Sequence, residues 1–133
     1  MEADKHGSYP MRILRVDLST ERIDEEVIED SEARKYVGGT GLGTKFLYEE
    51  VPPGVAWSDP ANRISLCTGP LAGTRVAGSG TFSVVTKGPM TNLAAASQAN
   101  GFFGAFLRSA GFHGRSWIIG PWVTSCARPS PAA

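Results

Sequence analysis

Apolar and polar positions alternate near the start of the chain, and this alternation predicts two strands. Between residues 14 and 18, Leu, Val and Leu alternate with Arg and Asp, which is the pattern of a strand with one buried face. Ser19 and Thr20 form a turn, after which Arg22–Ile28 can pair back on the first strand. The acidic residues of this second strand predict that it lies at an edge or faces solvent.

Two helices are predicted next, separated by glycines. The first begins at Asp30 or Ser31, either of which can cap it, and runs through Val37 until the glycines at 38 and 39 end it. The second carries the apolar positions 42, 46 and 47 on one face and ends before the prolines at 52 and 53.

The rest of the chain predicts strands and one further helix. Buried strands are expected at residues 64–68 and 82–86, and Gly88–Pro89 turns the chain. A helix is predicted at residues 99–110, closed by a glycine, and residues 117–119 open another strand. Together these elements predict an α+β fold with a mixed β-sheet, short helices and mainly non-local strand pairing.

Charge is distributed unevenly, although the formal net charge of the chain is +0. All 13 acidic residues lie within residues 1–59 beside 7 Lys and Arg, whereas residues 60–133 hold 6 Lys and Arg and no acid. Either the halves attract each other or the acidic half faces solvent, or the second half faces an anion. No basic run or basic–aromatic patch indicates nucleic acid as a partner.

The two cysteines, Cys67 and Cys126, show neither metal-site nor redox-pair spacing. Cys67 lies in an apolar run and is expected to be buried as a small hydrophobe. No signal peptide is recognisable and no apolar run approaches membrane-spanning length, so we expect a cytoplasmic location and no membrane association. No arrangement of Ser, His, Cys or Asp predicts a catalytic residue or a metal ligand.

The most informative segment is residues 69–104, which is polar, rich in glycine and free of acidic residues. Backbone with so little side-chain bulk can approach a large ligand closely. Its N–H groups, with no carboxylate nearby, suit a ligand that carries phosphate.

This segment and three others together resemble the N-terminal domain of aldehyde:ferredoxin oxidoreductases. Within it, GPLAGT, VVTKGPMT and NGFFGA follow one another at the family's spacing. The others are MRILRVDLST at residues 11–20, YVGGTGLGTKFLYEEVPPG at 36–54 and GFFGAFLRSAGF at 101–112. The resemblance extends from Met11 to Gly114, and its specificity lies in the combination of motifs.

The resemblance implies a tungsten or molybdenum bis-pterin enzyme with a 4Fe–4S cluster. By this resemblance, the complete enzyme oxidises an aldehyde to a carboxylic acid and passes electrons through the cluster to ferredoxin. The family's N-terminal domain contains two similar α+β repeats that share the cofactor surface, and this chain holds roughly the first. The cluster's cysteines belong to later domains, so we expect this fragment alone to be inactive. The metal and the substrate stay open, since some relatives reduce aromatic thioesters.

The resemblance also places Thr81, Gln98, Asn100 and Gly101 at the pterin. Thr81 stands where the family usually has a pterin-contacting arginine, so it keeps a hydroxyl without a charge, and Arg75 could compensate. Gln98 stands at the position of an asparagine whose amide contacts the pterin, and Asn100 at that of a glycine whose backbone does so. The alternatives are a tight turn before the strand and a helix cap at Asn100.

The glycines of residues 38–43, GGTGLG, invite a dinucleotide-binding interpretation. That fingerprint requires a strand immediately before it, and here a helix is predicted. The alternative is a joint between two helices, where glycines supply positive φ angles.

We therefore predict a flexible leader at 1–10, a partial N-terminal pterin-binding domain at 11–119 and an irregular tail at 120–133. The tail contains three prolines and fits either out-of-frame sequence or a genuine extension. The leading hypothesis is an N-terminal fragment of an aldehyde:ferredoxin-type oxidoreductase. The alternative is a non-catalytic binding or interaction module derived from this family.

Overall fold

The computed structural model describes residues 11–112 and 114–118. The predicted leader, the predicted tail and Cys126 lie outside these residues, as do His113 and Ile119. The elements in chain order are β1 (Met11–Asp17), β2 (Arg22–Ile28), α1 (Asp30–Tyr36), α2 (Gly39–Glu50), β3 (Arg63–Thr68), β4 (Thr81–Lys87), β5 (Ala94–Asn100), α3 (Phe102–Ser109) and β6 (Gly114–Ile118).

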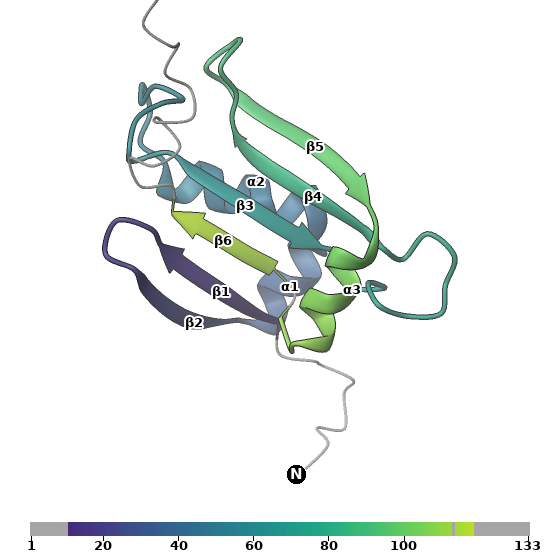
Figure 1. Ribbon diagram of the computed structural model, residues 1–133. Coiled ribbons are helices and arrows are strands. Elements are labelled where there is room, and N and C mark those ends of the chain that lie inside the picture. Colours follow the sequence, from purple (N-terminus) through teal and green to yellow (C-terminus); the bar gives the residue numbers. More distant parts are fainter. Residues whose placement is uncertain (1–10, 113, 119–133) are drawn as a thin grey trace, which may run out of the picture.

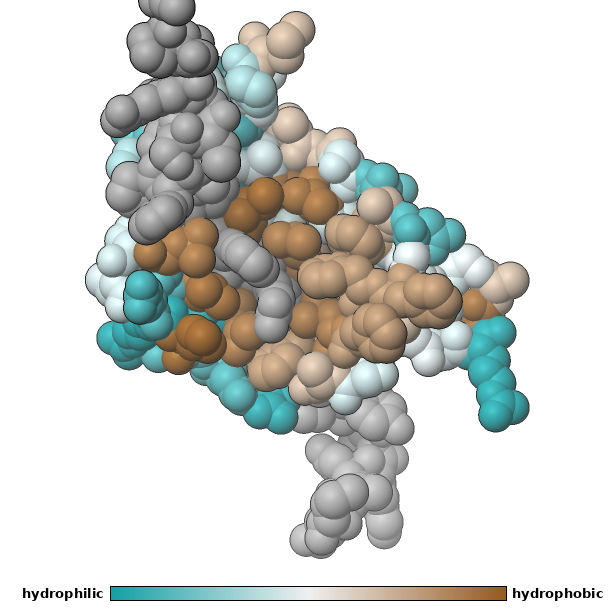
Figure 2. All heavy atoms as spheres, viewed as in Figure 1, coloured by the Kyte–Doolittle hydropathy of each residue, from teal (hydrophilic) through white to brown (hydrophobic). Residues whose placement is uncertain are grey.

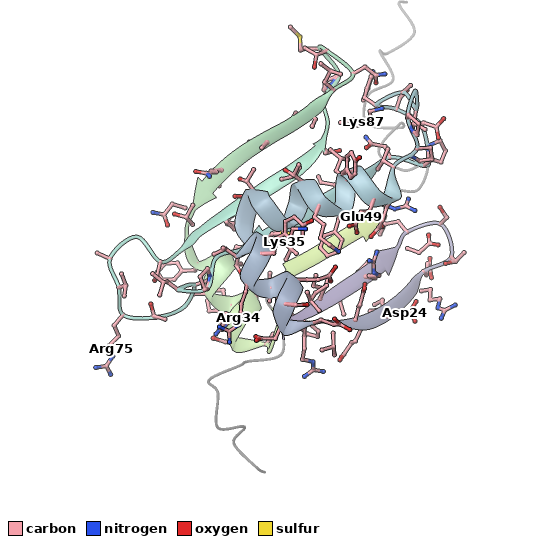
Figure 3. All side chains as sticks on the ribbon, turned by 180° about the vertical axis from the view of Figure 1, so that it is seen from behind. Asp24, Arg34, Lys35, Glu49, Arg75 and Lys87 are labelled. Carbon is pink, nitrogen blue, oxygen red and sulfur yellow. The ribbon has the colours of Figure 1, made fainter. Side chains whose placement is uncertain are left out.

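All the strands belong to one six-stranded sheet in the order β2-β1-β6-β3-β4-β5. The pair β1–β6 is parallel and the others are antiparallel, so the sheet is mixed, as predicted. Helices α1 and α2 cover one face of the sheet, and α3 lies at the ends of β3, β4 and β5 (Figures 1 and 3). The prediction of an α+β fold is confirmed.

The hairpin β1–β2 forms where the alternating pattern predicts it, with Met11 opposite Ile28 and Asp17 opposite Arg22. The Asp17 carboxylate accepts the N–H of Ser19 at 2.8 Å, which closes the turn. This hydrogen bond to the charged form lowers the pKa of Asp17 below its ordinary value. Strand β2 is an exposed edge strand, as its acidic residues predict.

The two helices on the sheet also form as predicted, but their ends differ. Glu29 precedes α1 without a side-chain cap, so the predicted cap at Asp30 or Ser31 is wrong. Asp30 lies instead in the first turn and pairs with Arg34 at 2.7 Å. Acidic side chains in the first turn interact favourably with the positive end of the helix dipole, even when they do not cap the helix.

The glycine-rich segment 38–43 is mostly the first part of α2, not only a joint. Gly38 has φ 133°, and a Cβ on it would lie 2.6 Å from the carbonyl oxygen of Thr68. Gly43 lies against Val85, where a Cβ would approach the Val85 side chain to 2.7 Å. Glycine at these positions therefore lets α2 lie close to β3 and β4.

The core lies between these helices and the sheet. Ile13, Leu42, Phe46 and Cys67 are buried in one cluster, and Leu47 and Val85 belong to a second. The predicted apolar face of α2 and the predicted burial of Cys67 are both confirmed. Each aliphatic or aromatic side chain buried here contributes roughly 1.5–3 kcal/mol through the hydrophobic effect.

The predicted helix at residues 99–110 is too long, because Ala94–Asn100 forms strand β5. Gly88–Pro89 begins a hairpin, and β5 pairs with β4 along its whole length. Helix α3 begins at Phe102, with Gly101 as N-cap and no side-chain cap, so the alternative of a cap at Asn100 is wrong. The backbone hydrogen bonds of the hairpin outweigh the helical propensity of this alanine-rich segment.

The opposite face of the sheet carries apolar side chains without α1 or α2 over it. Figure 2 shows them gathered over the middle of this face. Ile23 and Val27 of β2 are exposed there, because they alternate with the buried Ile28. At the far end, the Phe103 ring of α3 packs against the Phe82 ring with centroids 4.8 Å apart.

Candidate functional site

The open end of the β4–β5 hairpin brings the four predicted pterin-contacting residues together. Thr81 lies opposite Asn100 in the register, and Ser83 lies opposite Gln98. Opposite residues of an antiparallel pair share a face, so the side chains of both pairs lie on the face of the sheet that α2 covers. Gly101 follows directly, and its N–H donates to the carbonyl oxygen of Gly80 at 3.2 Å.

The polar side chains at this end are exposed and mostly unpartnered. The Thr81 hydroxyl donates to the carbonyl oxygen of Gly78 at 3.2 Å, but its oxygen can still accept. The amides of Gln98 and Asn100 are exposed and form no hydrogen bond with any residue that the structure describes. Each amide therefore offers both donors and an acceptor to a ligand.

Gly80 provides a close approach of backbone to backbone at the same place. A Cβ on Gly80 would lie 2.5 Å from the carbonyl oxygen of Gly101 and 2.8 Å from the side-chain oxygen of Asn100. Any larger residue at position 80 would push these atoms apart. Glycine here therefore allows the Asn100 amide to lie close to the strand ends.

The N-terminus of α2 adjoins this site. The Thr40 hydroxyl donates to the Ser83 hydroxyl at 3.0 Å, so the first turn of α2 lies beside β4. This turn contains no acidic residue and has no side-chain cap, and the same is true of α3. The free N–H groups of such helix ends attract anions.

Sequence reasoning did not select Thr40 and Ser83. The apolar periodicity of positions 42 and 46 could have indicated Thr40, because it extends the helix back into the glycine-rich segment that contains this residue. The signal for Ser83 was its inward position in a predicted buried strand. The dinucleotide interpretation is wrong, because helix α1 and not a strand precedes residue 38.

Arg75 does not supply the charge that Thr81 lacks. It lies in the loop at residues 69–80 and extends away from the rest of the molecule (Figure 3). The loop is held by hydrogen bonds of its own, such as the Ser79 hydroxyl to the carbonyl oxygen of Thr74 at 2.9 Å. Arg75 therefore brings no charge to the hydroxyl and amides at the open end.

The ion pairs of the acidic half of the chain form mainly within that half. Arg15 lies between Glu26 and Glu50, 2.7 Å from a Glu50 oxygen, and its pKa is raised by the hydrogen bond to Glu50. Buried Lys45 pairs with Glu49 at 2.9 Å and Glu32 at 3.1 Å. Burial alone would lower the pKa of Lys45, but these carboxylates outweigh it and raise the pKa.

Among the described residues, the one ion pair that joins the two halves is Arg63–Glu50 at 3.4 Å. Mutual attraction of the halves therefore explains little of the uneven charge. Arg75 and Lys87 have no carboxylate partner in the part of the chain that the structure describes, and the Lys87 ammonium donates to the carbonyl oxygen of Val55. Arg75 and Lys87 therefore carry positive charge that no carboxylate of the described residues neutralises.

No group of three His, Cys, Asp or Glu side chains capable of holding a metal ion occurs within residues 11–112 and 114–118. Burial raises the pKa of the Cys67 thiol to about 12, so this cysteine stays protonated and shielded. No helix among the same residues is long and apolar enough to cross a membrane.

A cavity of about 900 Å³ lies at the other end of the hairpin, near the C-terminal end of α2. Its lining includes Leu47, Val51, Lys87 and Leu93, but none of the predicted pterin-contacting residues. The exposed amides and the cavity therefore mark two separate places on the hairpin.

The residues at the open end suit the polar edge of a pterin. A pterin ring presents alternating donors and acceptors, which two unpartnered amides and a hydroxyl match. A pterin's phosphate would find the uncapped N-terminus of α2 or α3 instead of an arginine. The close approach at Gly80 adds backbone atoms to the same surface.

Comparison with known proteins identifies the family. The model of the aldehyde ferredoxin oxidoreductase N-terminal domain matches residues 13–116. A tungsten-containing aldehyde ferredoxin oxidoreductase of Pyrococcus horikoshii is 40% identical over 104 residues, covering 78% of this chain and 17% of that protein. The WOR-like subunit of an aliphatic sulfonate oxidoreductase of Pyrococcus furiosus is 35% identical over 112 residues, covering 80% and 17%.

A solved structure supports the same assignment. The active-site complex BamBC of benzoyl coenzyme A reductase with 1,5-dienoyl-CoA matches with a TM-score of 0.77 and 32% sequence identity. The match covers 80% of this chain and 16% of that one. The chain thus spans about a sixth of the length of its relatives, and it belongs to the aldehyde ferredoxin oxidoreductase family, whose N-terminal domain it matches.

Proposed function

We propose that this chain contributes part of the pterin-binding surface of a tungsten- or molybdenum-dependent aldehyde:ferredoxin-type oxidoreductase. The observation that carries the proposal is the pair of exposed amides of Gln98 and Asn100, which form no hydrogen bond with any described residue, with Asn100 close to Gly80. The names of several relatives favour tungsten. In the complete enzyme we expect oxidation of an aldehyde to a carboxylate, in the cytoplasm, with ferredoxin as electron acceptor.

Each residue at the open end has a distinct expected role. Gln98 and Asn100 hydrogen-bond the pterin ring through their amides, and the Thr81 oxygen accepts from a ring or side-chain N–H. Gly101 contributes its carbonyl or Cα surface, because its N–H already donates to Gly80. The bound metal–pterin group supplies the redox chemistry, and these residues bind and orient it.

The test is a titration of the full ¹⁵N-labelled chain with a stable phosphorylated pterin, followed by backbone amide chemical shifts. We expect the shift changes to concentrate at residues 81 and 98–103 and to be absent from the hairpin turn at residues 88–93. Changes at the hairpin turn alone, or none at all, would refute the proposed surface.

Two variants sharpen this test. Gln98→Ala and Asn100→Ala should each raise the Kd for the pterin by about 5–10-fold, as expected for one lost hydrogen bond of about 1 kcal/mol. Neither should change the thermal midpoint, because both amides are exposed and form no hydrogen bond with a described residue. Met90→Ala in the hairpin turn serves as the control, because Met90 is exposed and distant along the hairpin. Equal affinities for all three variants would contradict the assigned roles.

A further inference from the structure

Strand β5 is an exposed edge without the features that usually protect one. All seven of its residues, AAASQAN, are exposed, and among the strands that the structure describes it pairs with β4 alone. It contains no charge, no proline and no large apolar side chain. Natural sheets normally protect such edges with charges, proline, bulges or a covering element, because unpaired backbone groups can recruit another strand.

The opposite edge of the same sheet is protected. Strand β2, RIDEEVI, carries four charged residues, and its Arg22 and Asp24 form an ion pair at 2.8 Å. Pairing β2 with a copy of itself would bring like charges together, which is unfavourable. The contrast identifies β5 as the edge of this sheet that is open to pairing.

The hydrogen bonds of the hairpin show which backbone groups of β5 are free. The Gly88 N–H donates to the carbonyl oxygen of Leu93 at 2.9 Å, and the Gly101 N–H donates to that of Gly80 at 3.2 Å. Bonded and non-bonded pairs alternate along an antiparallel ladder, so odd-numbered residues of β5 bond to β4. The N–H and C=O groups of residues 94, 96, 98 and 100 therefore point outward.

We propose that two copies of this chain pair antiparallel through β5, about a two-fold axis at Ser97. Ala96 then lies opposite Gln98 of the second copy, and Ala94 opposite its Asn100. The outward-pointing groups satisfy one another along a strand of roughly 23 Å, and small uncharged side chains raise no clash or repulsion. An antiparallel pair of identical strands closes on itself, which gives a dimer and not a filament.

The side chains at the two ends of β5 favour the same arrangement. Leu93 precedes the strand and is 66% exposed, and Phe102 follows it and is 78% exposed. The two-fold axis brings the Phe102 end of each copy beside the Leu93 end of the other. Apolar side chains that face solvent in one chain are then partly covered in the pair. The pairing uses backbone groups, so the Gln98 and Asn100 side chains remain on the sheet face.

The first test is the mass of the full chain by light scattering after size exclusion across a dilution series. We expect a rise from 14.1 kDa toward twice that mass with increasing concentration. Ala96→Pro removes an outward N–H without breaking the ladder to β4, so it should stay at the single-chain mass. Ala96→Ser keeps the N–H and should behave like the parent chain. A single-chain mass at every concentration, or an Ala96→Pro variant that still doubles, would overturn the proposal.

The second test is amide hydrogen exchange of the parent chain, which does not depend on the folding of any variant. Amides of residues 95, 97 and 99 should be protected at every concentration, because they bond to β4. Amides of residues 94, 96, 98 and 100 should become protected only as the concentration rises. Association without this even-numbered protection would show that copies meet through another surface, and would also overturn the proposal. Neither result depends on pterin binding.

Discussion

Gly38 occupies a position that no other residue fits. Its φ of 133° lies where only glycine is unstrained, and a Cβ would lie 2.6 Å from the carbonyl oxygen of Thr68. We expect Gly38→Ala to lower the free energy of unfolding by about 1–3 kcal/mol. Urea unfolding checks this, with Gly69→Ala as the control, because a Cβ there meets nothing within 4 Å. Equal losses in both variants would show that the contact with Thr68 is unimportant.

Cys67 gives the stability of the fold a defined dependence on pH. Burial raises its pKa from 9.0 to about 12 in the folded chain. Below the unfolded value the thiol is protonated in both states and adds no pH dependence. Between about pH 9 and 12 the unfolded chain ionises while the folded one does not, so the free energy of unfolding falls as pH rises.

The measurement is urea unfolding at a series of alkaline pH values, for the parent chain and for Cys67→Ala. Over this range the free energy of unfolding should fall with pH in both proteins. The slope for the parent should be steeper than that for the variant by up to about 1.4 kcal/mol per pH unit. Parallel slopes would mean that Cys67 ionises equally in both states.

Residue-level prediction from sequence succeeded where one pattern dominated. Leu42 and Phe46 follow helical periodicity and Cys67 lies in an apolar run, so their burial followed directly. Thr40 and Ser83 were missed because their contact joins residues 43 positions apart, and no local pattern reports it. Whether Thr81, Gln98, Asn100 and Gly101 bind a pterin stays a prediction, although the structure places them side by side.

Among the elements, the loop at residues 69–80 contrasts with the strand that follows it. Most of its residues are exposed, and it is held largely by hydrogen bonds within itself. Two of its glycines have positive φ angles. Glycine loses more backbone conformational entropy than other residues when a loop becomes ordered. We expect its amides to exchange much faster than those of β4, and to slow when a phosphorylated pterin binds.

Hydrogen exchange followed by mass spectrometry, with and without the pterin, measures this difference. The hairpin turn at residues 88–93 is the internal control, because it lies at the opposite end of β4 and β5. Exchange in the loop as slow as in β4 without ligand would argue against a ligand-facing loop.

Element prediction failed at β5 for a physical reason. Its sequence, AAASQAN, has neither the alternation nor the β-branched residues of a strand, and alanine favours helix. The segment becomes a strand because β4 offers it a full ladder of hydrogen bonds. The strand has no β-branched, charged or large apolar side chain. This explains both why it was not predicted as a strand and why its edge is unprotected.

For the whole molecule, the sequence allowed the α+β class and the mixed sheet to be predicted, but not the strand order. Order depends on which strands meet in space, and β1 and β6 are about a hundred residues apart. The family could be predicted because a combination of motifs at one spacing is more specific than any single propensity, and the match of the family's N-terminal domain to residues 13–116 confirms it.

The whole chain should bind no stoichiometric iron and show no aldehyde-dependent reduction of a viologen dye. No cluster of potential metal ligands occurs in residues 11–112 and 114–118, and the chain spans 17% of its tungsten-containing relatives. Elemental analysis and anaerobic absorbance spectra check the first point and a dye assay the second. Stoichiometric iron with charge-transfer absorbance would contradict this expectation.

The central position of β6 has a consequence for the order in which the protein forms on the ribosome. β6 lies between β1 and β3, parallel to the first and antiparallel to the second. Until residues 114–118 leave the exit tunnel, the nascent chain holds β1–β2 and β3–β4–β5 as two separate pieces with a missing strand between them. The sheet therefore cannot close gradually during synthesis, and a nascent chain stalled before Gly114 should expose both inner edges to chaperones.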